Sequence, residues 1–258
     1  MDISELNRQQ SRDIHRHPWE LARGKAIRFL LAGKSRNYKH IADIGSGDNF
    51  IPNEILKAKL STNYSCIDTA YNYETIELLK TTTDISNLTL FKSFAEFELI
   101  KKPADCVLFL DVLEHCQDDR QVLSAVISSP AIEQDALILI TVPAFQKLFS
   151  KHDTLLGHYR RYSRKKLIAL CTSEKLEVLQ NGYFFSSLLP IRVVQKIIDA
   201  RKFKKREKSI ENWRGKKLIT KIISSILWID FHICYLFSRV GIHLPGLSCY
   251  CLCRKVLS

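Results

Sequence analysis

The sequence predicts an α/β fold, in which a mostly parallel sheet is covered by helices on both faces. Two observations lead to this prediction. Short apolar runs alternate along the chain with segments whose apolar residues recur at helical spacing. Two of those runs, Ala104 to Leu110 and Ala136 to Val142, are continuously apolar, as expected for strands that are buried on both faces.

The first half of the chain begins with a helix and then alternates between strand and helix. The helix after the first strand has a proline in its first turn, where proline is well tolerated. In order, the expected elements are a helix at Trp19–Leu31, a strand at Lys39–Ile44, a helix at Pro52–Leu60, a strand at Tyr64–Asp68, a helix at Tyr73–Thr81 and a strand at Leu88–Phe91.

The second half continues the alternation up to a last strand at the end of the chain. Ser163 precedes a helical run and is of a residue type that caps helix N-termini. In order, the expected elements are a strand at Ala104–Leu110, a helix at Asp118–Ser128, a strand at Ala136–Val142, a helix at Ser163–Thr172 and strands at Leu176–Phe185 and Leu247–Val256.

The composition is that of a globular enzyme. The 258 residues are 46% hydrophobic and 26% charged, which excludes a disordered chain, and 9 Gly with 7 Pro exclude collagen-like and low-complexity classes. The length allows one large domain, or one domain with an appendage. The net charge of +12 favours an anionic partner, such as nucleic acid, a phosphorylated metabolite or an acidic membrane surface.

The chain has eight cysteines and begins with a polar segment that is unlike a signal peptide. We therefore expect free thiols in a reducing compartment. The closely spaced Cys249, Cys251 and Cys253 lack the Cys-x2-Cys spacing of zinc knuckles. They are interpreted as alternating buried thiols of a strand, and no metal site is predicted.

One segment carries most of the positive charge. Residues 192 to 221 contain twelve basic and three acidic residues, and an apolar run from Ile222 to Phe237 follows, interrupted by Asp230 and His232. This run is shorter than the twenty or so apolar residues of a membrane span. A basic segment beside an apolar, aromatic helix favours a position in the membrane interface. The alternative is a solvated basic helix followed by a helix packed on the domain.

The first strand runs into a glycine turn that can approach a ligand. The segment contains Asp43, Gly45 and Gly47, and glycines permit backbone conformations that are closed to other residues. The turn lacks the third glycine of a dinucleotide fingerprint, because Phe50 stands there, and the chain has no nucleotide-hydrolysing phosphate loop.

Acidic residues follow the next strands of the sheet. Asp68 ends the second strand, at a distance from Gly47 that suits a carboxylate binding the hydroxyls of a ribose. Asp111, Glu114 and His115 follow the fourth strand. Because ligands bind at the carboxyl ends of parallel strands, we expect these groups to line one crevice. The alternative for Asp43 and Asp68 is that both are turn-forming acids.

The run from Asp43 to Gly47, together with Asp68 and the run from Asp111 to His115, resembles the class I S-adenosylmethionine-dependent methyltransferases. The Leu-Glu-His run is similar to the branch that methylates small molecules, lipids and quinones. The resemblance implies a Rossmann-like, seven-stranded sheet with an antiparallel last strand, and S-adenosyl-L-methionine as cofactor. It implies that the cofactor contacts are Asp43, Gly45, Ser46, Gly47, Asp68, Thr69, Ser93, Phe94, Asp111, Val112 and His115.

The loop after the fifth strand concentrates polar residues beside the expected methyl group. Histidine can accept a proton from an attacking hydroxyl near neutral pH, so His152 and His158 are the candidate catalytic residues. Arginines clamp phosphates or carboxylates, so Arg160, Arg161 and Tyr162 are the candidate substrate contacts. The alternative is a structural loop in which an arginine pairs with an acid such as Asp153 or Glu114.

The sequence thus predicts a methyltransferase for a small or amphipathic acceptor, lipid-linked or glycan. Residues 192–242 are the expected contact with an anionic membrane surface, in the cytoplasm or on the inner face of a membrane. Nucleic acid is not the expected partner, although an RNA methyltransferase and an inactive assembly protein remain alternatives. The expected parts are a helical cap (1–35), a cofactor-binding core (36–185 and 247–258) and a helical insertion (186–246).

Overall fold

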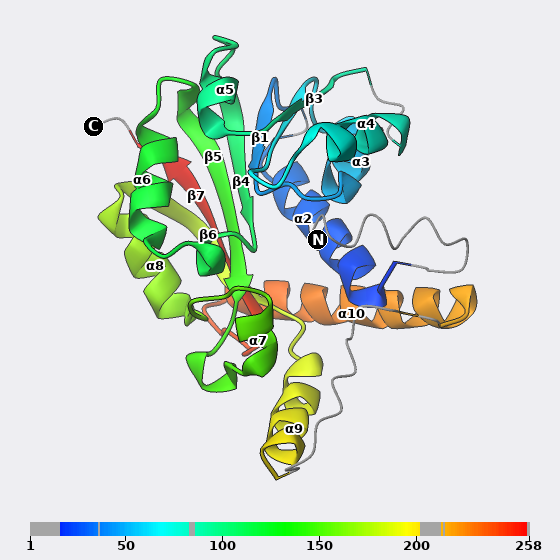
Figure 1. Ribbon diagram of the computed structural model, residues 1–258. Coiled ribbons are helices and arrows are strands. Elements are labelled where there is room, and N and C mark those ends of the chain that lie inside the picture. The colour runs from blue at the N-terminus through cyan, green and yellow to red at the C-terminus, as the bar shows by residue number, and fades with distance from the viewer. Residues whose placement is uncertain (1–15, 36, 83–85, 202–212, 214, 257–258) are drawn as a thin grey trace.

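Seven strands form one sheet in the order β3-β2-β1-β4-β5-β7-β6 (Figure 1). The computed structural model describes residues 16–35, 37–82, 86–201, 213 and 215–256. Strand β7 is antiparallel to both neighbours and the other pairings are parallel, so the predicted seven-stranded, mostly parallel sheet is confirmed. The strands are β1 (Ile41–Ile44), β2 (Tyr64–Ile67), β3 (Leu88–Phe91), β4 (Ala104–Leu110), β5 (Ile132–Pro143), β6 (Leu176–Phe184) and β7 (Ser248–Lys255).

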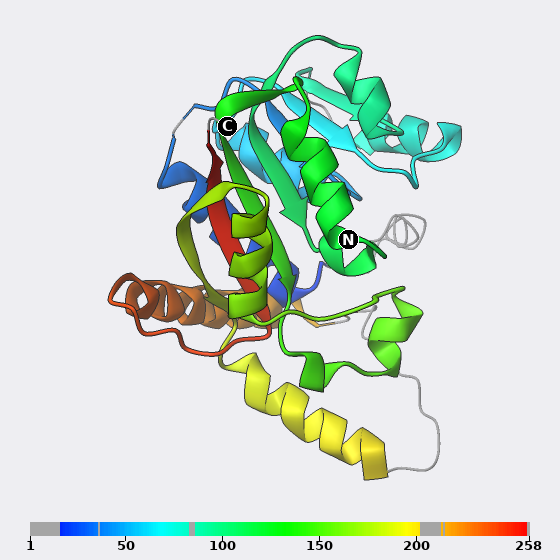
Figure 2. The same cartoon turned by 90° about the vertical axis from the view of Figure 1, so that its left-hand side faces the viewer.

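Helices cover both faces of the sheet, and each face has its own apolar core. One core joins the sheet to α5 (Phe94–Glu98), α6 (Asp119–Ser128) and α8 (Arg164–Ser173). Figure 2 looks onto this side and shows α6 and α8 in front of the sheet. The other core joins the sheet to α2 (Pro18–Ala32), α3 (Phe50–Lys57), α4 (Tyr73–Thr82) and α10 (Lys217–Arg239).

The predicted helical insertion before the last strand is present. It comprises α9 (Leu188–Arg201) and α10, and both lie with α7 (Lys151–Leu155) at the end of the sheet where β5 ends (Figures 1 and 2). The carboxylate of Asp230 on α10 accepts hydrogen bonds from the backbone N–H and the hydroxyl of Ser187, just before α9. The most basic part of the insertion, residues 202–212, lies outside the described residues.

Helix α10 is amphipathic, and its buried side packs on α2 and β6. Leu227, Phe231 and Cys234 are buried at helical spacing, and the ring of Phe29 on α2 meets Phe231 and Tyr235 edge-on. The helix has 23 residues, longer than the apolar run counted from the sequence, because it begins at Lys217. By length and composition it could cross a membrane, although 28% of its most apolar window is buried in the protein.

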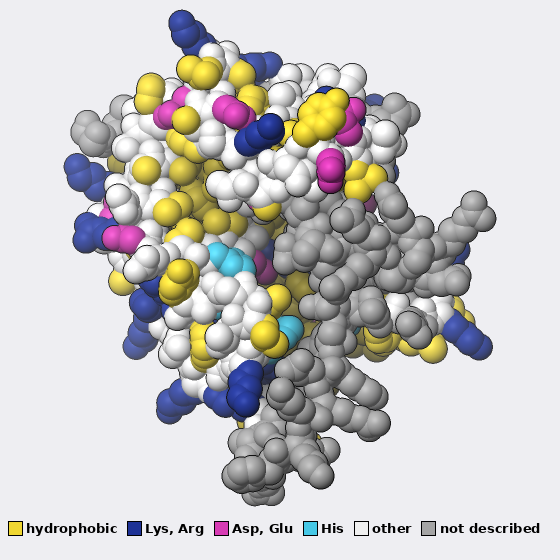
Figure 3. Space-filling model, viewed as in Figure 1, with side chains coloured by type: hydrophobic (Ala, Val, Ile, Leu, Met, Phe, Trp, Pro, Cys, Tyr) yellow, Lys and Arg dark blue, Asp and Glu magenta, His cyan; other side chains and the backbone are white. Residues whose placement is uncertain are grey.

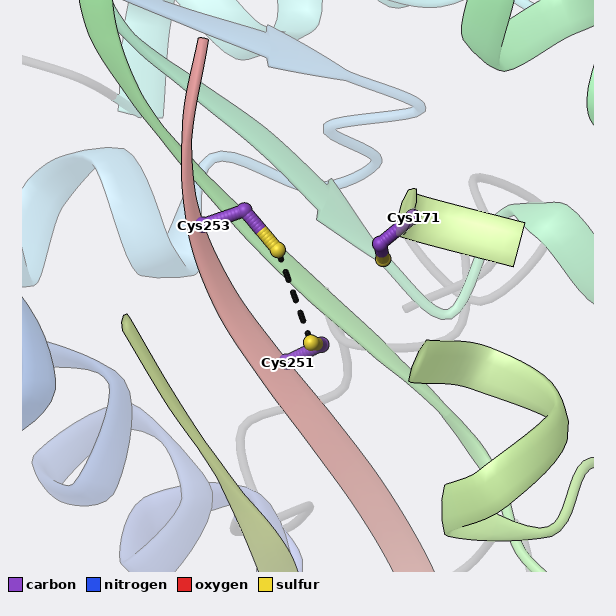
Figure 4. A group of neighbouring side chains, drawn as sticks. All are labelled: Cys171, Cys251 and Cys253. Atoms are coloured by element: carbon purple, nitrogen blue, oxygen red, sulfur yellow. Dashed lines mark hydrogen bonds between the residues drawn. The ribbon is translucent and has the colours of Figure 1, made fainter. Parts of the chain in front are cut away.

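Strand β7 places three cysteines in the core beside α8. Cys249, Cys251 and Cys253 are buried, as the sequence predicts, and their alternation directs all three into the core that contains Cys171 of α8. The sulfurs of Cys251 and Cys253 lie 3.5 Å apart, with the Cys171 side chain facing them (Figure 4). All eight cysteines are free thiols.

Candidate functional site

The glycine turn after β1 adopts the backbone conformation that its sequence suggests. Gly45 and Gly47 have φ of +68° and +65°, values that residues with a Cβ rarely adopt. The N–H of Gly45 donates to the carbonyl oxygen of Ile67 at 2.7 Å, which ties the turn to the end of β2. A Cβ at Gly45 would lie 2.7 Å from Cγ2 of Val112, so the segment after β4 also packs against this turn.

Asp68 lies beside the turn at the tip of β2. Its carboxylate accepts hydrogen bonds from the backbone N–H of Gly47 (3.0 Å) and of Ala70 (2.9 Å). A carboxylate offers about four acceptor positions, so roughly two are left for a ligand. Since the group is fixed by two backbone donors at the carboxyl end of a strand, it can accept hydrogen bonds from a pair of ribose hydroxyls. Thr69, the next residue, is exposed.

Asp43 and Ser46 support the turn from inside. The Asp43 side chain is buried and accepts a hydrogen bond from the hydroxyl of Tyr64 at 2.8 Å. Burial raises the pKa of Asp43 to about 7, and this hydrogen bond opposes the rise only in part. Ser46 Oγ lies 2.7 Å from the hydroxyl of Tyr71, which also donates to the carbonyl oxygen of Gly47.

Asp111, directly after β4, is held by an arginine that the sequence reading missed. It has φ of +57°, and its carboxylate accepts from the hydroxyl of Thr141 (3.0 Å) and pairs with Arg23 of α2 (2.8 Å). Arg23 also donates to Thr141 Oγ1 at 2.9 Å. The N-terminal helix therefore reaches the carboxyl ends of β4 and β5. The same helix also carries Lys25 and Arg28, so no sequence signal singled out Arg23.

Ser93 and Phe94 begin helix α5 after β3. Ser93 Oγ accepts from the N–H of Glu96 at 3.2 Å, so this hydroxyl caps the helix. The Phe94 ring packs against Phe97, with centroids 5.6 Å apart. The predicted contacts of Ser93 and Phe94 with the adenine side of a cofactor stay predictions, and the hydroxyl of Ser93 has a structural partner already.

The loop after β5 is organised around the buried carboxylate of Asp153. It accepts hydrogen bonds from Arg161 Nε (2.6 Å) and the N–H of Ser150 (2.9 Å), and it lies 3.1 Å from His158 Nδ1. Burial alone would raise the pKa of Asp153, but the bonds from His158 and Arg161 outweigh it and hold this pKa well below its usual range. The pairing of Arg161 with Asp153 is the structural alternative weighed above.

The other predicted substrate contacts also have partners in the protein. The Tyr162 side chain is buried, and its hydroxyl lies 2.5 Å from the carboxylate of Asp119. Arg160 pairs with Asp119 at 3.1 Å and, with Arg161 and Lys166, lines an open cavity of about 560 Å³. The substrate roles of Arg160, Arg161 and Tyr162 stay predictions, and Tyr162 shows no surface to a ligand here.

Two histidines and a buried glutamate meet where the segment after β4 contacts the loop after α7. The rings of His115 and His158 lie 4.6 Å apart, nearly perpendicular, and the N–H of Tyr159 donates to the carbonyl oxygen of Glu114. Glu114 is fully buried, and neither carboxylate oxygen has a hydrogen-bond partner among the described residues. Burial, and secondarily Asp111, raises the pKa of Glu114 well above its usual range.

His152, the other candidate catalytic histidine, lies on α7 and is partly exposed. Figure 3 shows histidine side chains beside a hollow with an apolar floor.

Comparison with known proteins shows which solved structures share this fold. No family model and no curated protein matches the sequence. Among solved structures, the N-methyltransferase NodS of Bradyrhizobium japonicum, in complex with S-adenosyl-L-homocysteine, is 11% identical, with a TM-score of 0.55 over 98% of this chain and 97% of its own. An S-adenosylmethionine-dependent methyltransferase of Archaeoglobus fulgidus is 14% identical, with a TM-score of 0.51 over 90% and 94%. The [4+2]-cyclase SpnF is 10% identical, with a TM-score of 0.55 over 90% and 80%.

The chain therefore has the class I methyltransferase fold that its motifs suggested. The sheet order, the antiparallel β7 and the glycine turn after β1 all agree with this class. Likeness at these identities establishes the fold alone. Since one of the similar proteins is a cyclase, the chemistry has to be argued from the site.

Proposed function

We propose that this protein is an S-adenosylmethionine-dependent methyltransferase that acts on a small or amphipathic acceptor, lipid-linked or glycan, at a membrane surface. The cofactor part of the proposal rests on three features that fit S-adenosylmethionine. The glycine turn allows close approach of the backbone, Asp68 keeps acceptor positions for ribose hydroxyls, and Val112 closes the turn from the β4 side.

The residues of the site suit transfer to an oxygen acceptor. When bound, S-adenosylmethionine supplies a methyl group that is already activated on a sulfonium. The protein then has to hold the acceptor in line with the methyl group and to remove its proton. We assign this proton to His152 or His158, which follow β5 in the chain, and Asp153 orients the ring of His158.

The observation that carries the membrane part is an exposed apolar stripe on α10. It consists of Ile222, Ile226, Ile229, Ile233 and Leu236, continued by Val240 directly after the helix, all between 44% and 73% exposed. The spacing of four, three, four, three and four residues keeps them on one side of the helix, opposite the side packed on α2. An exposed stripe of this length is typical of a docking surface, and here it would bring an amphipathic acceptor to the carboxyl ends of the strands.

Helix α9 extends the apolar surface at the same end of the molecule. Ile191, Val194 and Ile198 are exposed at helical spacing. Lys196 donates to the carbonyl oxygen of Phe149, and Arg192 donates to Ser150 Oγ at 3.0 Å, so α9 is attached to the loop of the candidate catalytic histidines. A shift of α9 on contact with a membrane would therefore also move the loop that carries His152 and His158.

Two assays on the purified protein test the proposal. We expect it to float with anionic vesicles and to transfer labelled methyl groups from S-adenosylmethionine to a component of a cognate lipid extract. Strong, salt-dependent binding to RNA without vesicle binding would favour the alternative of an RNA methyltransferase instead. Absence of any methyl transfer from a protein that floats and binds the cofactor would favour an assembly role.

A further inference from the structure

Glu114 and His115, after β4, and His158, after α7, bring three metal-ligating groups together. One carboxylate oxygen and one nitrogen from each ring all lie within 4.8 Å of one another. Ligand atoms on opposite sides of one ion are about 4–4.5 Å apart, given metal–ligand distances of roughly 2.0–2.3 Å. A small approach of the three side chains would therefore let them share one ion.

Glu114 supplies an independent reason to expect a cation. A buried carboxylate normally accepts several hydrogen bonds, because leaving it without partners costs much free energy. Glu114 is 0% exposed, and both of its oxygens lack a hydrogen-bond partner among the described residues. The neighbouring carboxylate of Asp111 already has partners in Arg23 and Thr141, so Glu114 is the acid of this pair whose oxygens lack partners among the described residues.

The ring of His158 is oriented in the way that metal-binding histidines commonly are. Its Nδ1 faces the carboxylate of Asp153, which Arg161 and Ser150 hold in place. A proton on Nδ1 leaves the lone pair on Nε2 free for an ion, and metal-binding histidines commonly donate their other ring N–H to a carboxylate in this way. The hydrogen bond from the N–H of Tyr159 to the carbonyl oxygen of Glu114 holds the segment of His158 against the segment of Glu114 and His115.

We propose that Glu114, His115 and His158 bind a divalent transition-metal ion, and that this ion binds the acceptor hydroxyl. Two imidazoles and one carboxylate suit ions such as Mn²⁺, Fe²⁺, Co²⁺ or Zn²⁺. Three protein ligands leave positions open for a further ligand, and the exposed His115 makes the cluster reachable from solvent. The acceptor class is a molecule with a hydroxyl, and adjacent oxygens would let it chelate the ion.

This inference deepens the proposed function and rests on it for the reaction. A metal ion lowers the pKa of a bound hydroxyl, whose proton leaves to solvent. The resulting oxyanion would attack the methyl carbon of S-adenosylmethionine, so that the carbon–oxygen bond forms as the carbon–sulfur bond breaks and the electron pair stays on sulfur. In this assignment His158 holds the ion instead of acting as a free base.

Titration with Co²⁺ tests the metal site without any cofactor or acceptor. The chelator-treated full-length protein is titrated, and binding is followed by calorimetry and by the visible absorption of Co²⁺. We expect one equivalent to bind with nitrogen–oxygen ligation, and Glu114→Gln, which keeps the shape of the side chain, to weaken binding at least tenfold. Circular dichroism checks that the variant is folded.

The cysteine cluster of Figure 4 provides the matched control, because Cys171, Cys251 and Cys253 also lie within 4.8 Å of one another. Cys251→Ala should leave Co²⁺ binding unchanged. Intense sulfur-to-cobalt absorption lost in Cys251→Ala, unchanged binding by Glu114→Gln, or no binding by the wild type would each overturn the metal site. Binding of S-adenosylhomocysteine by the same samples is measured separately, so a failure of the metal site is distinguished from a failure of the proposed function.

Discussion

Gly45 is the residue at which the sequence motif and the structure agree most closely. The motif calls for a residue without a Cβ, and the structure gives two reasons for this at the same position. The backbone has positive φ, and a Cβ would collide with Val112. Both are local features of a turn between adjacent elements, which is why a short sequence motif predicts them.

Replacing Gly45 by alanine should destabilise the protein more than the same change at Gly241. Both glycines have positive φ, but nothing lies within 4 Å of a Cβ at Gly241. Gly241→Ala therefore carries backbone strain alone, whereas Gly45→Ala adds the collision with Val112. We expect Gly45→Ala to lower the free energy of unfolding by about 1–3 kcal/mol, measured by chemical denaturation. Equal losses in the two variants would contradict the packing of Val112 on the turn.

Asp43 should make the stability depend on pH. Its pKa is raised from 3.8 to about 7, so the folded protein binds this proton more tightly than the unfolded chain. The contribution of Asp43 to the free energy of unfolding therefore falls as pH rises from about 4 to about 7. Asparagine at this position still accepts the hydrogen bond from Tyr64 but does not titrate. The free energy of unfolding of Asp43→Asn, relative to that of the wild type, should therefore rise over this pH interval by a few kcal/mol at most. A constant difference across the interval would show that Asp43 is ionised throughout.

Contacts between residues far apart in the sequence could not be predicted. Arg23 and Thr141 are 118 residues apart, and their hydrogen bond depends on how α2 lies across the carboxyl ends of β4 and β5. The same holds for His158 beside His115. The motifs identified Asp68, Asp111 and the histidines as individual candidates, but the pairing of Asp111 with Arg23 required the fold.

The elements themselves were largely predictable, because each strand is a short apolar run and most helices are long enough to show a period. The five-residue helices α5 and α7 were missed, since they have fewer than two turns. Strand β5 begins at Ile132 because the polar residues Glu133 to Asp135 belong to its exposed end. The longest apolar run, from Ile222, begins inside α10, because Lys217 and Lys221 precede and interrupt the apolar pattern of this helix.

Charges on the apolar stripe of α10 should abolish vesicle binding without unfolding the protein. Ile226 and Ile229 are 55% and 59% exposed, so aspartate at both positions remains solvated in the free protein. If both side chains enter the membrane interface, the change costs several kcal/mol of binding, given about 1.5–3 kcal/mol for each buried isoleucine. We expect Ile226→Asp/Ile229→Asp to lower flotation with anionic vesicles at least tenfold.

Leu99→Asp is the control for this experiment. Leu99 is 78% exposed and follows α5, before the start of β4, so it lies at the opposite end of the sheet. It should leave flotation unchanged. Loss of binding in both variants would indicate a general effect of charge, and retention of binding by the α10 variant would remove the stripe from the proposed docking surface.

At the scale of the whole molecule, the carboxyl ends of the strands gather the candidate cofactor contacts, the histidine loop and the insertion. This follows from a parallel sheet, whose connecting loops meet at one edge. The sequence predicted that gathering, but it did not predict which face α10 covers. That choice depends on the apolar surface left open between α2 and β6, into which Leu227 and Phe231 fit.

Calorimetric binding of S-adenosylhomocysteine to the wild type, Asp68→Ala and Asp105→Ala tests the central claim most directly. Asp105, at the start of β4, is the matched control. Its carboxylate also accepts hydrogen bonds from two backbone N–H groups, of Lys39 and His40, but these lie at the opposite end of the strands. We predict micromolar binding by the wild type, weakened by about 1–3 kcal/mol in Asp68→Ala and unchanged in Asp105→Ala. No binding by folded wild type, or equal binding by Asp68→Ala, would contradict a cofactor site at the glycine turn.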